Sequence, residues 1–481
     1  MNNKNAQSEK FITMTTEPVE RLIGKLAVPT IISMLVTTFY NMADTYFVGK
    51  IGLNQPEAVK AMMQTRAQAA VGVVMALMAI IQAVGFFFGH GSGNYVSRAL
   101  GRKDFKSAEK IAVAGFGYAI IIGLAMALLG NLFAKPLAFL LGASKETVGY
   151  TVDYMRLILI GAPINMASVV LNNQMRFQGN ATYAMFGISF GAVLNIGLDA
   201  LFVLVFDMEV IGAALATIIG QAVSFVLLLI GINRSDCIKL KPKLFRFEKY
   251  SITEISRGGL PSLGRQGIAG VSTACLNHMA GIYGVLAFGT EAAGASAIAA
   301  MTVVSKVMLF AASALIGFGQ GFQPVCGFNY GAGLYDRVRK AFWFCVKVAF
   351  GFLLLLAVPA YILSGDIIAL FRGNDEIALA IGTTAMRMQI ITFPVMSWVV
   401  MSNMMLQTMG KVVSGTLLAV ARNGLMFIPA ILLLPSVFGL LGVQLAQPVA
   451  DVLSLLLAVP VTIKVLKELS LSNSNTTIEI S

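Results

Sequence analysis

The sequence predicts an all-α polytopic membrane protein: twelve transmembrane helices in two six-helix lobes, related by a pseudo-two-fold axis along the membrane normal. Three observations predict this class: the composition, apolar stretches that recur at membrane-spanning length, and an internal repeat. Of the 481 residues, 57% are hydrophobic and only 12% are charged, whereas about a quarter of the residues of a soluble domain are charged. Too few polar residues remain to cover the roughly three soluble domains that this length would imply.

The chain begins with a polar, charged segment, residues 1–22. It lacks the apolar core and small-residue cleavage site of a signal peptide, so we expect a cytoplasmic leader. Apolar stretches of about 20 residues, the length that crosses the hydrocarbon of a bilayer, then recur. A β-barrel would show alternating segments of about 10 residues instead. The predicted spans are 23–48, 67–90, 108–134, 150–172, 181–206, 209–232, 256–282, 292–320, 338–363, 378–405, 412–434 and 440–466.

These spans divide the chain into an N-lobe and a C-lobe of six helices each. The predicted boundaries are 23–232 for the N-lobe, 233–252 for a basic cytoplasmic linker, 253–466 for the C-lobe and 467–481 for a polar tail. With both termini inside, 23 of the 35 Lys and Arg residues fall in inner segments and 6 in outer loops. This bias is typical of cytoplasmic loops, and it accounts for most of the net charge of +12 without any nucleic-acid partner.

The two halves also resemble each other in sequence. Span two ends in GHGSGNYVSRALG from Gly89, and span eight ends in GQGFQPVCGFNYG from Gly319. Equivalent Pro, Asn and Gly residues occur at identical spacing in spans four and ten, as Pro163, Asn172 and Gly179, and as Pro394, Asn403 and Gly410. Several features in the same order indicate duplication. Two six-span repeats share one orientation, and in such transporters the substrate site lies between the lobes near the midplane.

Acidic residues within the first-half spans are the main candidates for function, because charges inside a membrane are costly. Asp44 in span one follows Tyr40 and Asn41 by one turn, and Asp199 in span five has Asn195 four residues earlier on the same face. Asn172 and Thr217 are expected to join them from spans four and six. A carboxylate withdrawn from water can exchange a proton near neutral pH, bind Na⁺ with amide oxygens, or attract a cationic substrate.

The second half carries mostly basic residues within its spans. They are Arg265, Lys306, Lys347, Arg387 and Arg422, with Asp451 as the main acid. We expect Arg422 and Asp451 to form a structural pair, because they lie at similar depth in neighbouring spans. Lys306 either lines the substrate cavity or extends from one end of its helix. Tyr40, Asn41, Lys306, Arg387 and Met404 are the candidate cavity residues, Met404 because methionine suits an adaptable apolar surface.

Motifs of soluble enzymes are missing from the sequence, which indicates a protein that is not an enzyme. There is no HExxH, GxSxG or Walker A sequence, and four scattered cysteines with two histidines do not suggest a metal site. We therefore expect no cofactor and no nucleotide-driven step. Duplicated six-helix halves favour an alternating-access transporter over a channel or a membrane enzyme, with energy drawn from an ion gradient or from the gradient of the substrate.

Five short motifs in order resemble those of the multidrug and toxic compound extrusion (MATE) family, most closely its DinF/MepA-like prokaryotic branch. They are Asp44-Thr45…Phe47-Val48-Gly49, Gly89…Ser97-Arg98…Gly101, Asn172…Gly179, Asn195…Asp199 and Gly212-Ala213-Ala214…Thr217. The resemblance covers residues 20–466. It implies two lobes forming a V in a prokaryotic plasma membrane, and efflux of amphipathic organic cations by proton or sodium antiport from a functional monomer.

By motif position, the resemblance carries the coupling role to the first-lobe acids. These are Asp44 and Asp199, with Asn172, Asn195 and Thr217 around them. Other branches of the family place acids in spans seven and ten, where this chain has Asn277, His278 and Arg387. A second-lobe sodium site is therefore not expected. The alternative is a flippase of the same superfamily for a lipid-linked envelope precursor, whose phosphate would be held by basic residues such as Lys306, Arg387 and Arg422.

Overall fold

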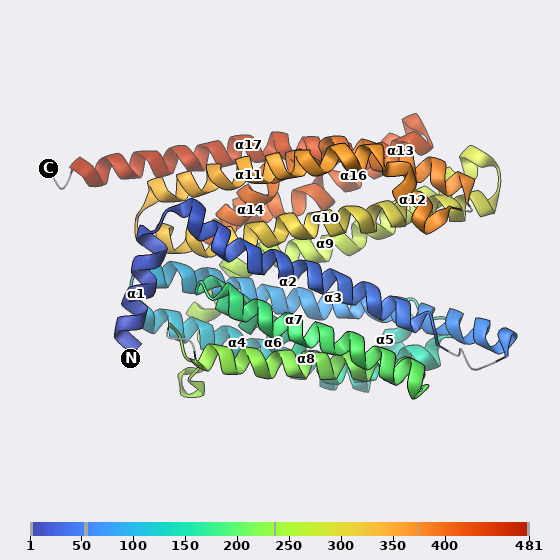
Figure 1. The fold of residues 1–481 in the computed structure, drawn as a ribbon, viewed down its shortest axis with the longest axis horizontal. Helices are drawn as coiled ribbons and strands as arrows, with labels where there is room; N and C mark the ends of the chain where they lie inside the picture. The colour runs from blue at the N-terminus through green and yellow to red at the C-terminus, as the bar shows by residue number, and fades with distance from the viewer. Residues whose placement is uncertain (1–2, 52–55, 235–236, 374, 479–481) are drawn as a thin grey trace.

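A computed structural model describes residues 3–51, 56–234, 237–373 and 375–478, and helices dominate these ranges (Figure 1). Twelve helical spans among them are long and apolar enough to cross a membrane, which confirms the predicted number. Large apolar side chains remain exposed on the outside of the bundle; Leu128 and Leu355, for example, are 73% and 71% exposed. Such an apolar surface fits lipid and not water.

The first half begins with a short helix before the first span. Its elements are α1 (Asn3–Thr16), α2 (Val19–Val48), α3 (Glu57–Gly101), α4 (Phe105–Leu132), α5 (Ala134–Leu140), α6 (Val148–Phe177), α7 (Ala181–Asp199), the π-helical turn η1 (Ala200–Val205) and α8 (Glu209–Arg234). Spans one to four are α2, α3, α4 and α6. Span five is α7 with η1, and span six is α8.

The second half repeats this order with more interruptions. Its elements are η2 (Pro242–Leu244), α9 (Lys249–Phe288), α10 (Glu291–Gly331), α11 (Tyr335–Ile362), α12 (Ser364–Arg372), α13 (Glu376–Thr392), η3 (Phe393–Val395), α14 (Met396–Met409), α15 (Val412–Val420), the π-helical turn η4 (Ala421–Leu425), α16 (Phe427–Phe438) and α17 (Leu440–Ile478). Span ten bends at η3, where Pro394 lacks the amide hydrogen that a continuous helix needs.

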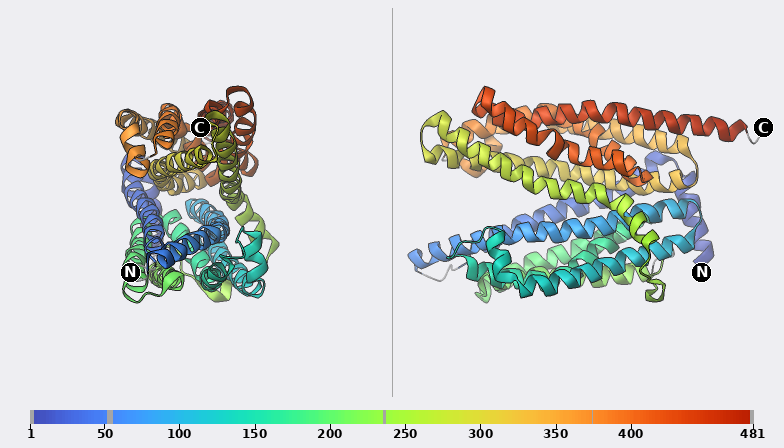
Figure 2. Two further views of the ribbon diagram at one scale, coloured as in Figure 1. Left: turned by 90° about the vertical axis from the view of Figure 1, so that its right-hand side faces the viewer. Right: turned by 180° about the vertical axis from the view of Figure 1, so that it is seen from behind.

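The two halves form two bundles that converge at one end of the molecule (Figures 1 and 2). Both termini lie at this end, which we call the closed end, and the bundles diverge toward the opposite end. Hydrogen bonds join α2 of the first lobe to α10 of the second. Thr30 Oγ1 donates to the Gly317 carbonyl (2.6 Å), and Thr38 Oγ1 lies 3.1 Å from Ser313 Oγ.

Glycines allow the two lobes to approach closely at the closed end. A Cβ on Gly101 would lie 2.9 Å from the carbonyl carbon of Phe328, and closer still to its oxygen. A Cβ on Gly331 would meet Arg98 in the same way, also at 2.9 Å from the carbonyl carbon. The contact is therefore reciprocal, as a two-fold arrangement of α3 and α10 requires, and the repeated Gly-rich motifs at the ends of spans two and eight form it.

Helix α1 lies across both lobes at the closed end. Lys10 Nζ donates to the carbonyl of Gly179 in the first lobe (2.8 Å), and Asn329 Nδ2 in the second lobe donates to the carbonyl of Met14 (3.1 Å). Met14 itself is only 1% exposed. The polar leader predicted from the sequence thus contains a helix that connects the lobes.

Candidate functional site

The two predicted acids of the first lobe lie close together inside that lobe. Asp199 is the last residue of α7 and is fully buried, and Oδ1 of Asp44 on α2 is buried as well. The carboxylates are close enough to interact electrostatically. Oδ1 of Asp44 and both oxygens of Asp199 have no hydrogen-bond partner in the described part of the chain. Buried polar atoms are normally bonded, so these oxygens are available to a cation.

Aromatic hydroxyl groups surround the two acids. Tyr40 on α2 and Tyr154 on α6 each interact electrostatically with both carboxylates, and Thr217 on α8 lies beside the Tyr154 hydroxyl. No basic residue of the described chain is among the charges acting on either acid. The site therefore collects negative charge without compensation, and this arrangement favours a bound proton, metal cation or organic cation.

The backbone changes conformation where Asp199 ends α7. The π-helical turn η1 starts at the next residue, and such turns frequently occur at functional sites. One helical turn before Asp199, Asn195 is 3% exposed, and neither atom of its amide has a hydrogen-bond partner. A Cβ on Gly220 of α8 would lie 2.9 Å from the Asn195 Cβ, so glycine permits the close approach of α8 that buries this amide.

Asn172 is tied to the start of α7. Its Nδ2 donates to the carbonyl of Ala184 (3.0 Å). The equivalent residue of the second half, Asn403, donates in the same way to the carbonyl of Gly415 (2.7 Å), also twelve residues onward. Both lobes thus use this asparagine to join neighbouring helices, although only the first lobe holds the two acids, so the hydrogen bond is a structural one.

The expected pair in the second lobe is confirmed. Arg422 Nε, in the π-helical turn η4, donates to Asp451 Oδ1 at 2.8 Å, and Gln447 Nε2 donates to the same oxygen at 2.8 Å. Asp451 is 1% exposed, and its charge is neutralised by the guanidinium. In contrast to the first lobe, the main acid of the second lobe is paired with a basic residue.

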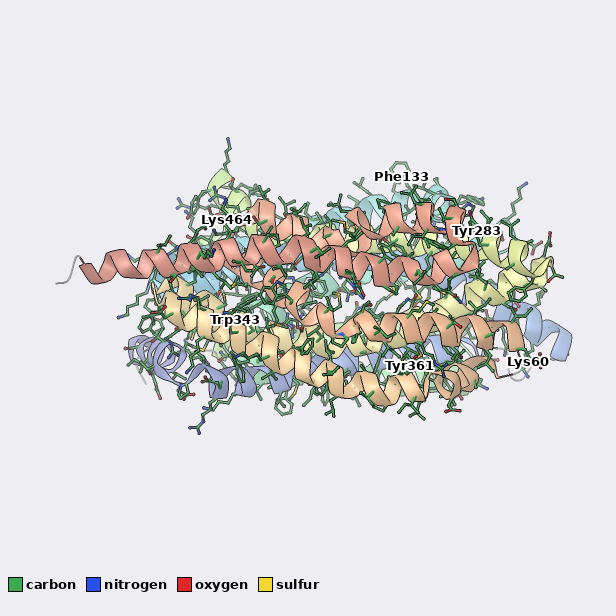
Figure 3. The ribbon with its side chains drawn as sticks, turned by 90° about the horizontal axis from the view of Figure 1, so that it is seen from above. Lys60, Phe133, Tyr283, Trp343, Tyr361 and Lys464 are labelled. Carbon is green, nitrogen blue, oxygen red and sulfur yellow. The ribbon has the colours of Figure 1, made fainter. Side chains whose placement is uncertain are left out.

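The remaining cavity candidates do not gather around the first-lobe acids. Arg387 Nε donates to Ser364 Oγ (2.9 Å), and its guanidinium lies over the ring of Tyr361. Both Trp343 and Tyr361 belong to α11. Figure 3 shows Trp343 nearer the closed end and Tyr361 farther from it. Lys306 is exposed on α10. Met404 is buried in the second lobe, with its sulfur against Gly319. The side chain of Asn41 lies outside the described residues.

A buried polar cluster between the lobes was not anticipated from the sequence. Arg176 falls between predicted spans four and five, where a loop is expected. It is 2% exposed, and its guanidinium donates to Gln320 of the second lobe and to Asn173. We define the interlobe polar cluster as the residues that surround this contact, which are His90, Asn173, Arg176, Ser262, Arg265, Gln320 and Gln407. Its residues are ordinary ones for helix ends, so the sequence alone carried no signal for it.

The position of Tyr154 beside the first-lobe acids was not predicted for a similar reason, because a tyrosine within a span is common.

The described residues contain no group of three or more His, Cys, Asp or Glu side chains that could hold a metal ion. All four cysteines lie in the described residues, and no disulfide joins any two of them. Carboxylates without a cationic partner, inside one of two lobes built from membrane-length helices, are typical of a multi-pass membrane transporter.

The chain belongs to the MatE family, whose model matches residues 29–201 and 269–432. Among similar curated proteins is the multidrug export protein MepA of Staphylococcus saprophyticus, 25% identical over 438 residues, which are 90% of this chain and 91% of that protein. The protein of the same name from Staphylococcus aureus is 24% identical over 455 residues, 94% of this chain and 95% of that one.

Solved structures of similar fold belong to the same family. One is described as the outward-facing conformation of a multidrug resistance MATE family transporter of the MOP superfamily. It has a TM-score of 0.86 at 22% identity, and the match covers 95% of this chain and 98% of that one. Another, a MATE in complex with MaL6, has a TM-score of 0.85 at 23% identity, with 95% and 99% covered. The twelve-span, two-lobe architecture predicted from the sequence is confirmed by these matches.

Proposed function

We propose that this protein is a secondary active multidrug efflux antiporter of a bacterial plasma membrane. It exports amphipathic organic cations in exchange for H⁺ or Na⁺ by alternating access. The observation that carries the proposal is the group of buried carboxylate oxygens without a partner within one lobe, which are Oδ1 of Asp44 and both oxygens of Asp199. The export activity named for the staphylococcal relatives supports the choice of substrate.

Competition for the same carboxylates couples the two flows. A cation that binds Asp44 and Asp199 excludes the other cation from them, so each weakens the binding of the other by the same factor. Tyr40, Asn195 and Thr217 shape this site and supply hydroxyl and amide groups, whereas Asn172 holds the opposite end of α7 through its bond to Ala184. The coupling ion is a substrate in this scheme, and no resident metal or cofactor is needed.

The closed end faces the cytoplasm in this proposal. The leader, the linker from 233 to 252 and the ends of α3 and α10 collect most of the basic residues, as loops on the cytoplasmic side do. Both termini are then cytoplasmic, and the two bundles diverge toward the outside. The protein acts as a monomer, because each copy contains both lobes.

The test is dye efflux from proteoliposomes with proton and sodium gradients imposed separately. Asp199→Asn should abolish efflux driven by the coupling gradient, while Asp153→Asn, an exposed acid on α6, should retain it. Full efflux by the Asp199→Asn protein would refute the assignment. The gradient that drives the wild-type protein identifies the coupling ion.

The flippase alternative has less support from the geometry. It requires basic side chains free to hold a phosphate, and Arg422 is already neutralised by Asp451. Arg387 is bound to Ser364 and Tyr361 within the second lobe. Loss of envelope synthesis on deletion of the protein, without a change in drug sensitivity, would favour the flippase.

A further inference from the structure

The interlobe polar cluster contains two arginines without a carboxylate partner. Arg176 of the first lobe donates to the amide oxygens of Gln320 and Asn173, and its Nε has no partner. Arg265 of the second lobe is half-buried, and it forms no ion pair or hydrogen bond with any other described residue. No carboxylate of the described residues is among the charges acting on either guanidinium. Buried charges are normally paired, so this arrangement lacks an anion.

The charges of both guanidinium groups act on one histidine. His90 is 2% exposed and interacts electrostatically with both Arg176 and Arg265. Its Nδ1 lies 2.8 Å from Ser262 Oγ, one turn before Arg265 on α9. Positive charges from opposite lobes thus both act on His90.

His90 adds no compensating charge. Its hydrogen-bond partner Ser262 is neutral, and Gln407 Nε2 donates to the same hydroxyl (2.7 Å). A histidine carries no negative charge in its neutral or its protonated form, so His90 cannot balance the arginines whichever nitrogen holds the proton. Two positive charges therefore remain in the cluster.

The cluster lies in the interface between the lobes, on the closed-end side. On α3 and α9, glycines bring the backbones together next to it: a Cβ on Gly258 would lie 3.1 Å from Gly91 Cα. Residues from both lobes are needed, so the two arginines come together only when the closed end is packed. An anionic group held between them would contact both lobes at once.

We propose that Arg176 and Arg265 form a subsite for the carboxylate or similar anionic group of a transported amphiphile. This inference rests on the proposed transport function and extends its substrate class. Cations bind the first-lobe acids, and zwitterionic amphiphiles add a contact at the interlobe polar cluster. A guanidinium has five N–H donors in a planar fork, which suits a carboxylate.

The test compares two dyes with one fluorophore. Rhodamine 110 has a free carboxylate, and rhodamine 123 is its methyl ester. Binding to the purified protein is measured by fluorescence polarisation, in buffers of chloride and of the larger anion isethionate. Binding needs no ion gradient, so a failure of antiport does not disturb the result.

We expect the wild-type protein to prefer rhodamine 110, and Arg265→Gln to weaken rhodamine 110 by about tenfold, the effect of one charge-assisted hydrogen bond. Binding of rhodamine 123 should change less than twofold, which also shows that the variant is folded. Arg265→Lys keeps the charge and should retain part of the preference. Arg156→Gln, an exposed arginine of α6, should leave both dyes unchanged.

Equal losses for both dyes, or no loss for either, would overturn the subsite. A third outcome would also overturn it: no preference between the dyes, with a thermal stability that depends on chloride and loses this dependence in Arg265→Gln. That result would assign the site to an inorganic anion from solution.

Discussion

A methyl group at Gly101 should open the closed end. The added Cβ would lie 2.9 Å from the Phe328 carbonyl carbon, whereas carbon atoms in contact are 3.5–4.0 Å apart. The two lobes must therefore separate locally by more than half an ångström, because the obstacle is backbone and cannot rotate away. Overpacking of this kind destabilises the packed conformation by about 1–3 kcal/mol. The ratio of molecules in which this end is open to molecules in which it is packed therefore rises by about 5- to 140-fold.

Cys326 is a native reporter for this shift. It is fully buried on α10 and close enough to Arg98 of the other lobe to interact with it electrostatically. With Cys237, Cys275 and Cys345 replaced by alanine, the rate of maleimide labelling measures how often this end opens. Gly101→Ala should raise the rate by the factor above, and Gly331→Ala should act in the same way, since its contact with Arg98 is reciprocal.

Gly24→Ala is the control. Gly24 lies in α2, and a Cβ there would have no neighbour within 4 Å. Its substitution tests the general effect of alanine in a helix. Unchanged labelling in both Gly101→Ala and Gly331→Ala, with the Gly24→Ala protein as reference, would refute the view that this glycine contact holds the lobes together.

Two further predictions concern stability in detergent, measured by thermal unfolding. Asp451→Asn leaves the Arg422 charge without a carboxylate and should lower the free energy of unfolding by about 3–5 kcal/mol. The double variant Arg422→Met, Asp451→Leu should recover most of this stability. An unchanged unfolding temperature in Asp451→Asn would contradict the pairing argument. Asp104 caps α4 by accepting from the amide of Ser107 (3.1 Å), and Asp104→Ala should cost about 1 kcal/mol. The hydrogen bond from Ser107 lowers the pKa of Asp104, so its contribution is complete above its unfolded pKa of about 3.9 and is lost as the pH falls through the lower folded value. An Asp104→Ala effect that grows on acidification would contradict this sign.

The architecture was predictable because each span must be long and apolar on its own. Twelve stretches of that kind, and paired motifs such as those at Gly89 and Gly319, are visible without tertiary information. The acids Asp44 and Asp199 were predictable for a related reason, since a carboxylate within an apolar stretch is costly and rare. The pairing of Arg422 with Asp451 followed from their similar depth in neighbouring spans.

The contacts between the lobes were not predictable from local patterns. Arg176 follows a polar run at the end of a span, so the sequence suggested an inner loop, and only the packing of α6 against α10 shows that it is buried. The same holds for α1, whose polar sequence gives no indication that Met14 is buried at a junction of two lobes. Both features depend on distant segments meeting, which a pattern within one span cannot encode.

The unequal charges of the two lobes have an electrical consequence. The first lobe offers two carboxylates without a cationic partner, whereas the second neutralises its own acid. On the proposed function, a cycle that brings two protons inward on these carboxylates and takes one monovalent cation outward moves one net positive charge into the cell. One charge crossing 100 mV gains about 2.3 kcal/mol, which alone sustains a substrate gradient of roughly fortyfold. The membrane voltage would then drive export even where the pH is equal on both sides.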